Sequence, residues 1–452
     1  MTTPSTSPPA PAWRRDLPLV TYSAGNFGKN LLLSSVDVTL LFMLTDILGL
    51  SPVAVGQLML AVLLGDLIFD IGSGVLASWA QPYGFDYRRI IAWGALPCSA
   101  GFALLFALPA LDWHSGVLIA AILLGFRGAY AIIDVPHNSL LARVAPGSHA
   151  RGRASGYRLF FSTLASLATA LVLAPAVMQA AHRGQPLRLA LIGAAGGALA
   201  CLALWISAMR WRRSEREPAP AIHAMALLPR FDPLFLAVAC IALITGFAMP
   251  MFGRMTFYLA SYVYDQPALA SRLLLAVTLG QLPGVLLWTW GVRHAEKTTL
   301  LALSHALTIL SIALFAMVGP GWLIPAAGLI GLALAGVFML PWGIVADAVD
   351  FAQMRHGTRR ETAAFAAVLV MIKASGAASI GLIGWTLGHL GYVAGAAQPP
   401  SVVMGMKIMG LGVPVLGSAV AILLLTRMSL GHARHASVLR VLNRRARRSA
   451  GG

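Results

Sequence analysis

The sequence predicts an all-α integral membrane protein with twelve transmembrane helices in two six-helix halves. Of its 452 residues, 58% are hydrophobic and only 11% are charged, whereas soluble proteins carry about 25% charged residues. The apolar residues form blocks of roughly 20 residues or more, which is the length that a helix needs to cross a bilayer. A polar interruption at residues 210–233 leaves six such blocks on each side.

The predicted spans follow one another with short polar connections. In the first half we expect them at residues 17–48, 53–80, 90–108, 116–141, 159–181 and 187–209. In the second half we expect them at residues 234–263, 273–290, 300–318, 323–345, 363–390 and 402–428. The predicted parts of the chain are a tail at 1–16, a first half at 17–209, a central loop at 210–233, a second half at 234–429 and a basic tail at 430–452.

The basic residues lie mainly in alternate connections between the spans. A net charge of +17 is compatible with nucleic-acid binding, but this alternation follows the positive-inside rule, by which Arg and Lys collect on the cytoplasmic side. We therefore predict that the protein has no nucleic-acid partner. We also predict that it lies in a bacterial inner membrane, with its central loop and both termini in the cytoplasm. The basic tail would lie on the anionic inner leaflet or would simply be solvated.

Polar and charged residues interrupt several spans, where each one needs a partner or a function because it is costly in lipid. They are Lys29, Asn30, Ser34 and Asp37 in the first span, Arg127, Tyr130 and Asp134 in the fourth, Arg158 at the start of the fifth, and Lys373 in the eleventh. Asn30, Ser34 and Asp37 share one helix face because of their i, i+4, i+7 spacing. Arg158 alone could be an ordinary cytoplasmic anchor, whereas Lys373 is too far from either loop to reach water.

Two carboxylates occupy the second span. Asp66 and Asp70 are separated by one helical turn, so their side chains stack. In an apolar helix two such carboxylates repel each other, so at least one is expected to have a raised pKa, and the two should titrate as a coupled pair. The pair could therefore bind a cation or share a proton. The alternative is that they are structural acids, each paired with a neighbouring Arg; their own helix contains no cation.

A charged segment follows the tenth span, in the sequence ADAVDFAQMRHGTRRETA. It contains Asp347, Asp350, Arg359 and Glu361. Ion pairs among these residues could form a cytoplasmic gate that breaks as the two halves rock, or the residues could simply be solvated in the loop. Elsewhere the sequence contains no cluster with metal-ligand spacing, no P-loop and no nucleophile elbow. We therefore predict that the protein is not an enzyme and needs no cofactor.

Five motifs in this order resemble the melibiose-permease-like glycoside–pentoside–hexuronide:cation symporter family of the major facilitator superfamily, over most of the chain. They are YSAGNFGKN followed by LTDILGLS, then GDLIFD, AIIDVPHNSLL, GYRLFFS, and ADAVDFAQMRHGTRRETAAFAAVLVMIKASG. The layout of two six-helix halves agrees with this fold, in which the solute site lies between the halves near the midplane. The resemblance implies a secondary transporter that couples solute movement to a cation.

The resemblance also implies roles for the candidate residues. Asp66 and Asp70 match carboxylates that bind the coupling ion, and Lys373 matches a cationic residue near them. Asp134 and Arg158 match ligands of sugar hydroxyl groups. Lys29 and Tyr130 match residues of the cavity wall in the N-terminal half. The residues that match the cytoplasmic charge network are Asp347, Asp350 and Arg359.

Several positions depart from the family pattern. Asn30 stands where the family often has a sugar-binding Asp, although Asp37 on the same face could supply the acid. Asn138 replaces an aromatic residue that stacks on the sugar. Phe69 and Ala131 replace oxygen-bearing side chains near the cation. Because sodium needs several oxygen ligands and a proton needs only one carboxylate, we expect coupling to H+ rather than Na+.

The sequence therefore predicts a cation-coupled symporter for a sugar, glycoside or uronide-like solute, working by alternating access as a monomer in contact with membrane lipid. A second hypothesis keeps the fold and exchanges the cargo for an amphiphilic or lipid-like molecule. A third is a membrane assembly factor or sensor that transports nothing. The joint presence of Asp66, Asp70, Asp134, Arg158 and Lys373 argues against the third.

Overall fold

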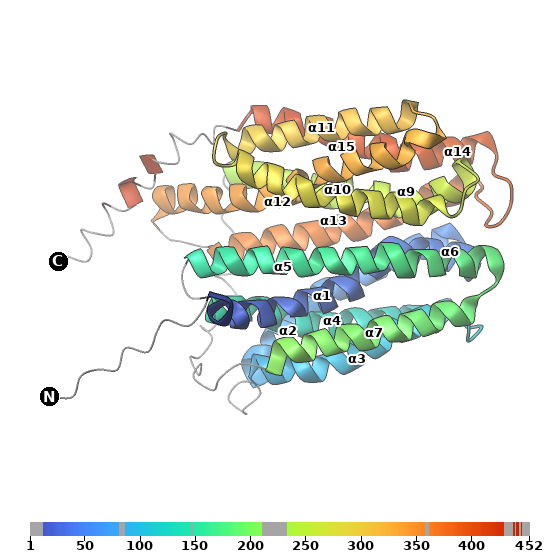
Figure 1. The fold of residues 1–452 in the computed structure, drawn as a ribbon, viewed down its shortest axis with the longest axis horizontal. Helices are drawn as coiled ribbons and strands as arrows, with labels where there is room; N and C mark the ends of the chain where they lie inside the picture. Colours follow the sequence, from blue (N-terminus) through green and yellow to red (C-terminus); the bar gives the residue numbers. More distant parts are fainter. Residues whose placement is uncertain are drawn as a thin grey trace.

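The computed structural model describes residues 12–80, 86–145, 148–209, 233–357 and 361–428, with a few positions between 437 and 444. The secondary structure of these residues is helical, without strands, and 12 of the helical stretches are long and apolar enough to cross a membrane. The predicted all-α, twelve-span fold is therefore confirmed. Figure 1 shows the spans running alongside one another in a bundle. Residues 1–11, most of the central loop (210–232) and most of the basic tail lie outside the described residues.

Six spans of the N-terminal half are built from the first seven helices. They are α1 (Ala12–Phe42) with a π-helical turn η1 (Met43–Ile47), α2 (Pro52–Ala80), α3 (Tyr87–Ala107), α4 (Gly116–Val144), α5 (Ser148–Ala168) with η3 (Thr169–Leu173) and α6 (Ala174–Arg183), and α7 (Pro186–Met209). Within this half, α1 packs on α5 and α7, and α3 packs on α4 and α7.

The six spans of the C-terminal half follow the same plan. They are α8 (Pro233–Phe247) with α9 (Met251–Tyr258) and η5 (Leu259–Val263), α10 (Leu269–Gly291), α11 (Lys297–Met317), η6 (Pro320–Trp322) with α12 (Leu323–His356), α13 (Glu361–His389), and α14 (Pro400–Lys407) with η7 (Ile408–Gly412) and α15 (Val413–Thr426). Here α12 packs on α10 and α11, and α13 packs on α8.

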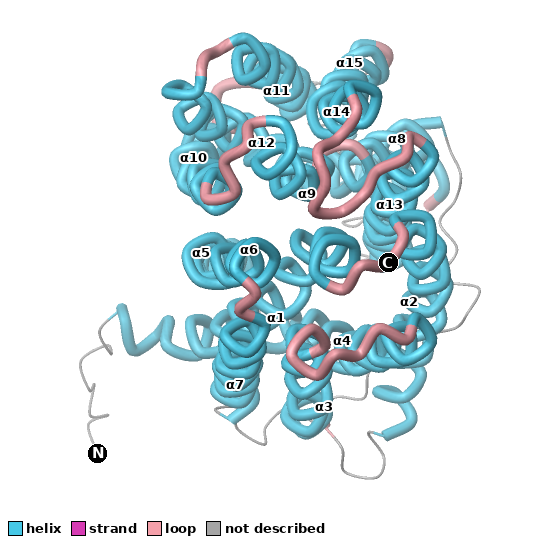
Figure 2. Tube along the Cα trace, turned by 90° about the vertical axis from the view of Figure 1, so that its right-hand side faces the viewer, coloured by secondary structure: helices cyan, strands magenta, loops and turns pink. Residues whose placement is uncertain are grey.

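The two halves meet along α2 and α13, which lie side by side in Figure 2. Glycines at this contact let the backbones approach closely, as is common between membrane helices. A methyl group on Gly56 would lie 3.0 Å from the carbonyl oxygen of Gly381. At Gly384 it would overlap the carbonyl oxygen of Pro52. The halves also meet where α1 packs on α9, at the end where α1 runs into η1, and where α10 packs on α5, η3 and α6.

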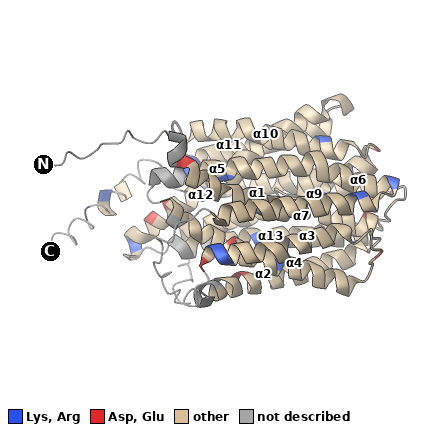
Figure 3. Cartoon of the chain, turned by 60° about the horizontal axis from the view of Figure 1, so that its bottom comes forward, with Lys and Arg blue, Asp and Glu red and all other residues tan. Residues whose placement is uncertain are grey.

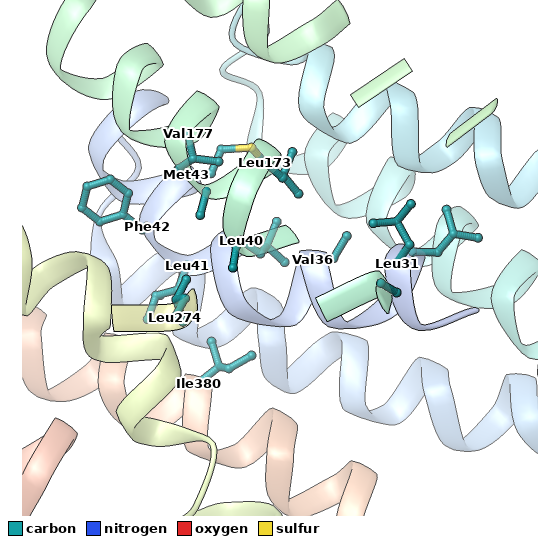
Figure 4. Close-up of a cluster of buried hydrophobic side chains, with 14 of the residues drawn as sticks. Leu31, Val36, Leu40, Leu41, Phe42, Met43, Leu173, Val177, Leu274 and Ile380 are labelled. Atoms are coloured by element: carbon teal, nitrogen blue, oxygen red, sulfur yellow. The ribbon is translucent and has the colours of Figure 1, made fainter. Parts of the chain in front are cut away.

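A hydrophobic cluster crosses this interface (Figure 4). It combines Leu40, Phe42 and Met43 of α1 and η1 with Leu274 of α10 and Ile380 of α13, all of them buried. Because lipid is as apolar as these side chains, the contact is stabilised by close van der Waals packing between the helices. The cluster therefore holds the halves together on one side of the polar centre described below.

The distribution of side chains on α2 shows how polar residues come to face inward. Leu64, Ile68 and Val75 are exposed, as expected for a surface that contacts lipid. Val62 and Asp66, one turn apart on the opposite face, are buried. In Figure 3 the helices are largely free of charged residues along their length. The charged side chains that line the cavity between the halves form the candidate site.

Candidate solute and coupling site

A cavity of about 370 Å³ lies between the two halves, within the range typical of small-molecule sites. On the N-terminal side it is lined by α1, α2, α4 and α5, and on the C-terminal side by α8, α9, α12 and α13. Seven of the predicted site residues line it; they are Lys29, Asn30, Asp37, Tyr130, Asp134, Arg158 and Lys373. The fold therefore brings these seven side chains, which were predicted from the sequence, to one place from four different helices.

Asp134 is the centre of a network in the N-terminal wall. Its Oδ1 lies 2.5 Å from Lys29 Nζ and accepts a hydrogen bond of 3.1 Å from Asn138 Nδ2. The side-chain oxygen Oδ1 of Asn138 accepts from both Lys29 Nζ, at 3.0 Å, and Arg158 Nη2, at 2.9 Å. Arg158 Nε also donates to Asn26 Oδ1 at 3.1 Å. We call these five residues the Asp134 cluster; it joins α1, α4 and α5.

Asp66 is paired with a cation from another helix. Arg127 of α4 donates from Nε to Asp66 Oδ1 at 2.8 Å and from Nη2 to Oδ2, which is a bidentate pair. Its Nη1 also lies 3.5 Å from Asp37 Oδ1. Arg127 lines the cavity, whereas Asp66 lies behind it and is 8% exposed. The guanidinium therefore separates the Asp66 carboxylate from the cavity.

Asp70 is paired across the two halves. Lys373 Nζ of α13 donates to Asp70 Oδ2 at 2.6 Å and lies 3.8 Å from Asp134 Oδ2. One ammonium group thus stands between an acid predicted to bind the coupling ion and an acid predicted to bind the solute. Each of the two stacked acids has its own basic partner. The alternative interpretation of the sequence expected an Arg for both, and this holds for Asp66, whereas the partner of Asp70 is a Lys. Sequence periodicity could not show this, because both cations come from other helices.

Asn30 and Asp37 have different environments. Asn30 Nδ2 donates to the Ser162 carbonyl oxygen at 2.8 Å and to Ser166 Oγ at 3.1 Å, and its Oδ1 accepts from Ser34 Oγ. Its amide is therefore engaged in joining α1 to α5. The Asp37 side chain is 39% exposed and stays available to the cavity. Tyr130, also in the wall, is buried.

The predicted gate is only partly within the described residues. Asp347 of α12 accepts hydrogen bonds of 2.6 and 2.9 Å from Lys297 Nζ at the start of α11, so this ion pair lies inside the C-terminal half. Asp350 also lies on α12 and is partly buried. Arg359 lies outside the described residues, and so does the side chain of Glu361. The role of these four residues as a gate stays a prediction.

Two features were not predicted from the sequence. The first is Arg254, in the motif PMFGRMTFY of the seventh span, which lines the cavity from α9. Its charge inside an apolar span was a signal that could have identified it. The other is a hydroxyl cluster around Asp46. Its carboxylate accepts from Thr45 Oγ1 and Tyr392 OH, both at 2.6 Å, and from Tyr262 OH; Thr45 Oγ1 also lies 2.7 Å from Tyr258 OH. This cluster connects η1 to the C-terminal half.

The twelve-span fold and the polar cavity between its halves define a multi-pass membrane transporter with the major facilitator fold. Residues 21–432 match the family described as MFS/sugar transport protein, and the chain belongs to that family. It is a transporter of the sugar and glycoside symporter type, not an enzyme, and proteins of this type need no cofactor beyond a coupling ion.

Similar proteins agree with this assignment. The chain is 23% identical to the putative glycoside/cation symporter YagG of Escherichia coli (strain K12), over 93% of each chain. It is 24% identical to the glucuronide carrier protein homolog of the same strain, over 88% of each chain. Among solved structures, the nucleoside transporter NupG matches with a TM-score of 0.61 and 13% identity, covering 93% of this chain and 99% of NupG. A bacterial homolog of the human lysosomal transporter Spinster matches with a TM-score of 0.60 and 15% identity, covering 94% and 99%.

Proposed function

We propose that this protein is a proton-coupled symporter for a sugar, glycoside or uronide-like solute, which works by alternating access in a bacterial inner membrane with both termini in the cytoplasm. The observation that carries the proposal is the position of Lys373. Its ammonium contacts Asp70 at 2.6 Å and lies 3.8 Å from Asp134. Protonation of Asp70 removes one of these two carboxylate charges, and Lys373 is then drawn toward Asp134 and the solute.

The N-terminal wall suits a polyhydroxylated solute. The Asp134 carboxylate and the Arg158 guanidinium lie on either side of the Asn138 amide. Vicinal hydroxyl groups can donate to a carboxylate and accept from a guanidinium through charge-assisted hydrogen bonds. In this proposal the solute replaces part of the contacts made by Lys29 and Asn138.

The surroundings of the acids favour a proton over sodium. Sodium, like calcium, is a hard cation that binds several oxygen ligands. Asp66 is occupied by Arg127 and Asp70 by Lys373. The neighbouring positions Phe69 and Ala131 have no side-chain oxygen.

The test is solute uptake into proteoliposomes under an imposed pH gradient or, separately, an imposed sodium gradient. We expect accumulation to follow the pH gradient and to be unaffected by sodium. Accumulation driven by sodium alone would refute proton coupling and leave the transporter assignment intact. The same uptake assay with a lysolipid in place of a sugar tests the alternative hypothesis that the solute is amphiphilic.

A further inference from the structure

Arg254 is a buried cation that lacks a carboxylate partner. It is 5% exposed, and within the described part of the chain its only hydrogen bond runs from Nη1 to Ser379 Oγ on α13. Its Nε has no hydrogen-bond partner. A buried, uncompensated charge is strongly destabilising, so a guanidinium in this position needs an anion at some stage of the transport cycle.

The neighbouring carboxylates do not fill this role. Asp37 lines the same cavity, but its ion pair is with Arg127. Asp66 is bound in a bidentate pair, also to Arg127. Asp66 is therefore occupied, and Asp37 is partly exposed to the cavity but forms no ion pair with Arg254 among the described residues.

The cavity also leaves room beside the guanidinium. Gly376 of α13 lines the cavity, and a methyl group added there would come within 3.5 Å of Arg254 Nη2. The glycine thus keeps the space next to Nη2 open. The planar guanidinium group of an arginine can donate two parallel hydrogen bonds to two oxygens of one oxyanion.

The charge balance of the site points in the same direction. The basic side chains that line the cavity are Lys29, Arg127, Arg158, Arg254 and Lys373. The acids that line it or pair with them are Asp37, Asp66, Asp70 and Asp134. The described site thus has one more cation than it has acids. Loading a proton on Asp70 would increase this excess, and an anionic solute would offset it.

We propose that Arg254 is a specificity-determining residue that binds a carboxylate or sulfonate of the solute from the C-terminal wall, while the Asp134 cluster binds the hydroxyl groups from the N-terminal wall. This proposal deepens the proposed function and rests on it for the sugar-like part of the solute. The shared chemistry is a single oxyanion on a polyhydroxylated body. An acidic solute would thereby contact both halves of the transporter at once.

The test measures binding to purified protein in nanodiscs with probes that differ in one group. Methyl glucoside, methyl glucuronide and a methyl glycoside with a sulfonate on its terminal carbon present the same ring with an alcohol, a carboxylate or a sulfonate. We expect at least one acidic probe to bind about 10-fold or more tighter than the alcohol, a difference of about 1.4 kcal/mol, because only the acids form a charge-assisted pair with the guanidinium. Arg254→Gln should reduce this preference to about twofold or less, and Arg254→Lys should keep part of it. Arg272→Gln, an exposed arginine at the start of α10, is the matched control.

The outcomes separate this proposal from the proposed function. Equal affinity of the wild-type protein for all three probes, or an equal loss for all three in Arg254→Gln, would overturn the role of Arg254 and leave a sugar transporter. If no probe binds, the sugar-like body is wrong, and the anion is tested alone by thermal unfolding with acetate and methanesulfonate against ethanol. Stabilisation of the wild type but not of Arg254→Gln by an acid would then support the oxyanion site. No stabilisation by either acid would overturn it.

Discussion

The N-terminal and C-terminal walls of the cavity differ in how their polar groups are satisfied. The N-terminal wall contains the Asp134 cluster, in which Asp134, Asn138 and Arg158 are bonded to one another or to α1. The C-terminal wall is mostly apolar or small, with residues such as Phe338, Leu369 and Gly376. Two cations line it among the described residues. Lys373 contacts Asp70 of the other half, and Arg254 has an Nε without a hydrogen-bond partner.

This difference separates recognition from coupling. A network that is already bonded internally holds its groups in place before the solute arrives, which lowers the cost of binding. A lysine that crosses between the halves changes its contacts when the halves move. We therefore assign the N-terminal wall to the solute body, and the C-terminal wall to the charge of the solute and to coupling.

The largest effect is expected from removing Asp134 or Arg158. Asp134→Ala leaves the ammonium of Lys29 without its closest carboxylate, and breaking a buried ion pair costs about 3–5 kcal/mol. Solute binding should fall by about 100-fold or more in either variant, for neutral and acidic solutes alike. Binding titrations with the purified variants, at equal amounts of folded protein, measure this loss.

The control for these variants is Asp112→Asn. Asp112 lies in the loop before α4 with a φ of 56°, a conformation that Asn tolerates, and it is not among the residues that line the cavity. Its uptake should match the wild type. If Asp134→Ala and Arg158→Ala also transport normally, the N-terminal wall does not recognise the solute and the comparison between the walls fails.

The sequence predicted one wall better than the other for a physical reason. Span length and hydropathy suffice for the twelve spans, because lipid requires long apolar helices. The N-terminal residues lie in motifs that resemble a known family. Ion pairs such as Asp66 with Arg127 and Asp70 with Lys373 depend on which helices pack together, and helical periodicity holds no information on that. Asn138 is an example of what the sequence does not show. The family comparison identified it only as the loss of an aromatic residue, whereas in the structure its side chain accepts hydrogen bonds from two cations.

The second prediction concerns the pair between Lys373 and Asp70. Asp70→Asn should lower solute accumulation under a pH gradient by about 10-fold, a change of about 1.4 kcal/mol, while solute exchange without a gradient continues. Asp66→Asn should behave in the same way if both acids take part in coupling. The measurement compares gradient-driven uptake with exchange in the same proteoliposomes.

A double variant sharpens this test. Replacing both partners of a buried pair is less harmful than replacing one, because no unpaired charge is left. Asp70→Asn combined with Lys373→Gln should therefore recover part of the exchange rate that Lys373→Gln loses alone. Strictly additive losses would mean that the two side chains act independently and that Lys373 does not connect the walls.

A smaller effect is expected at the hydroxyl cluster, which joins the halves outside the cavity. Burial and the neighbouring Asp46 charge raise the pKa of the Tyr392 hydroxyl, so it stays protonated and donates to Asp46. Asp46→Ala removes hydrogen bonds to a carboxylate, each of which contributes about 1.5–3 kcal/mol. Under the proposed topology this cluster is extracytoplasmic, so an impermeant thiol reagent should label a cysteine at Ala377, in the cavity, several-fold faster in Asp46→Ala.

The labelling experiment needs its own reference. Cys98 and Cys201 are buried, and Cys240 is exposed, so the measurement starts from a variant with Cys240→Ala. Tyr392→Phe removes one donor and should accelerate labelling less than Asp46→Ala does. Unchanged labelling in both variants would show that the hydroxyl cluster does not hold the halves together.

The smallest effect is expected at Asn30, where the two interpretations of one residue differ. The family resemblance makes it the counterpart of a sugar ligand, but its amide joins α1 to α5 through the Ser162 carbonyl oxygen and Ser166 Oγ. Loss of these bonds costs about 0.5–1.5 kcal/mol each, so Asn30→Ala should lower the thermal unfolding midpoint by a few degrees. Solute affinity should change by less than about threefold, which corresponds to about 0.7 kcal/mol. Ser34→Ala, which removes only a donor to Asn30 Oδ1, is the control and should lower the midpoint less. A large loss of solute affinity in Asn30→Ala, with an unchanged thermal unfolding midpoint, would show that Asn30 binds the solute as the family resemblance implies.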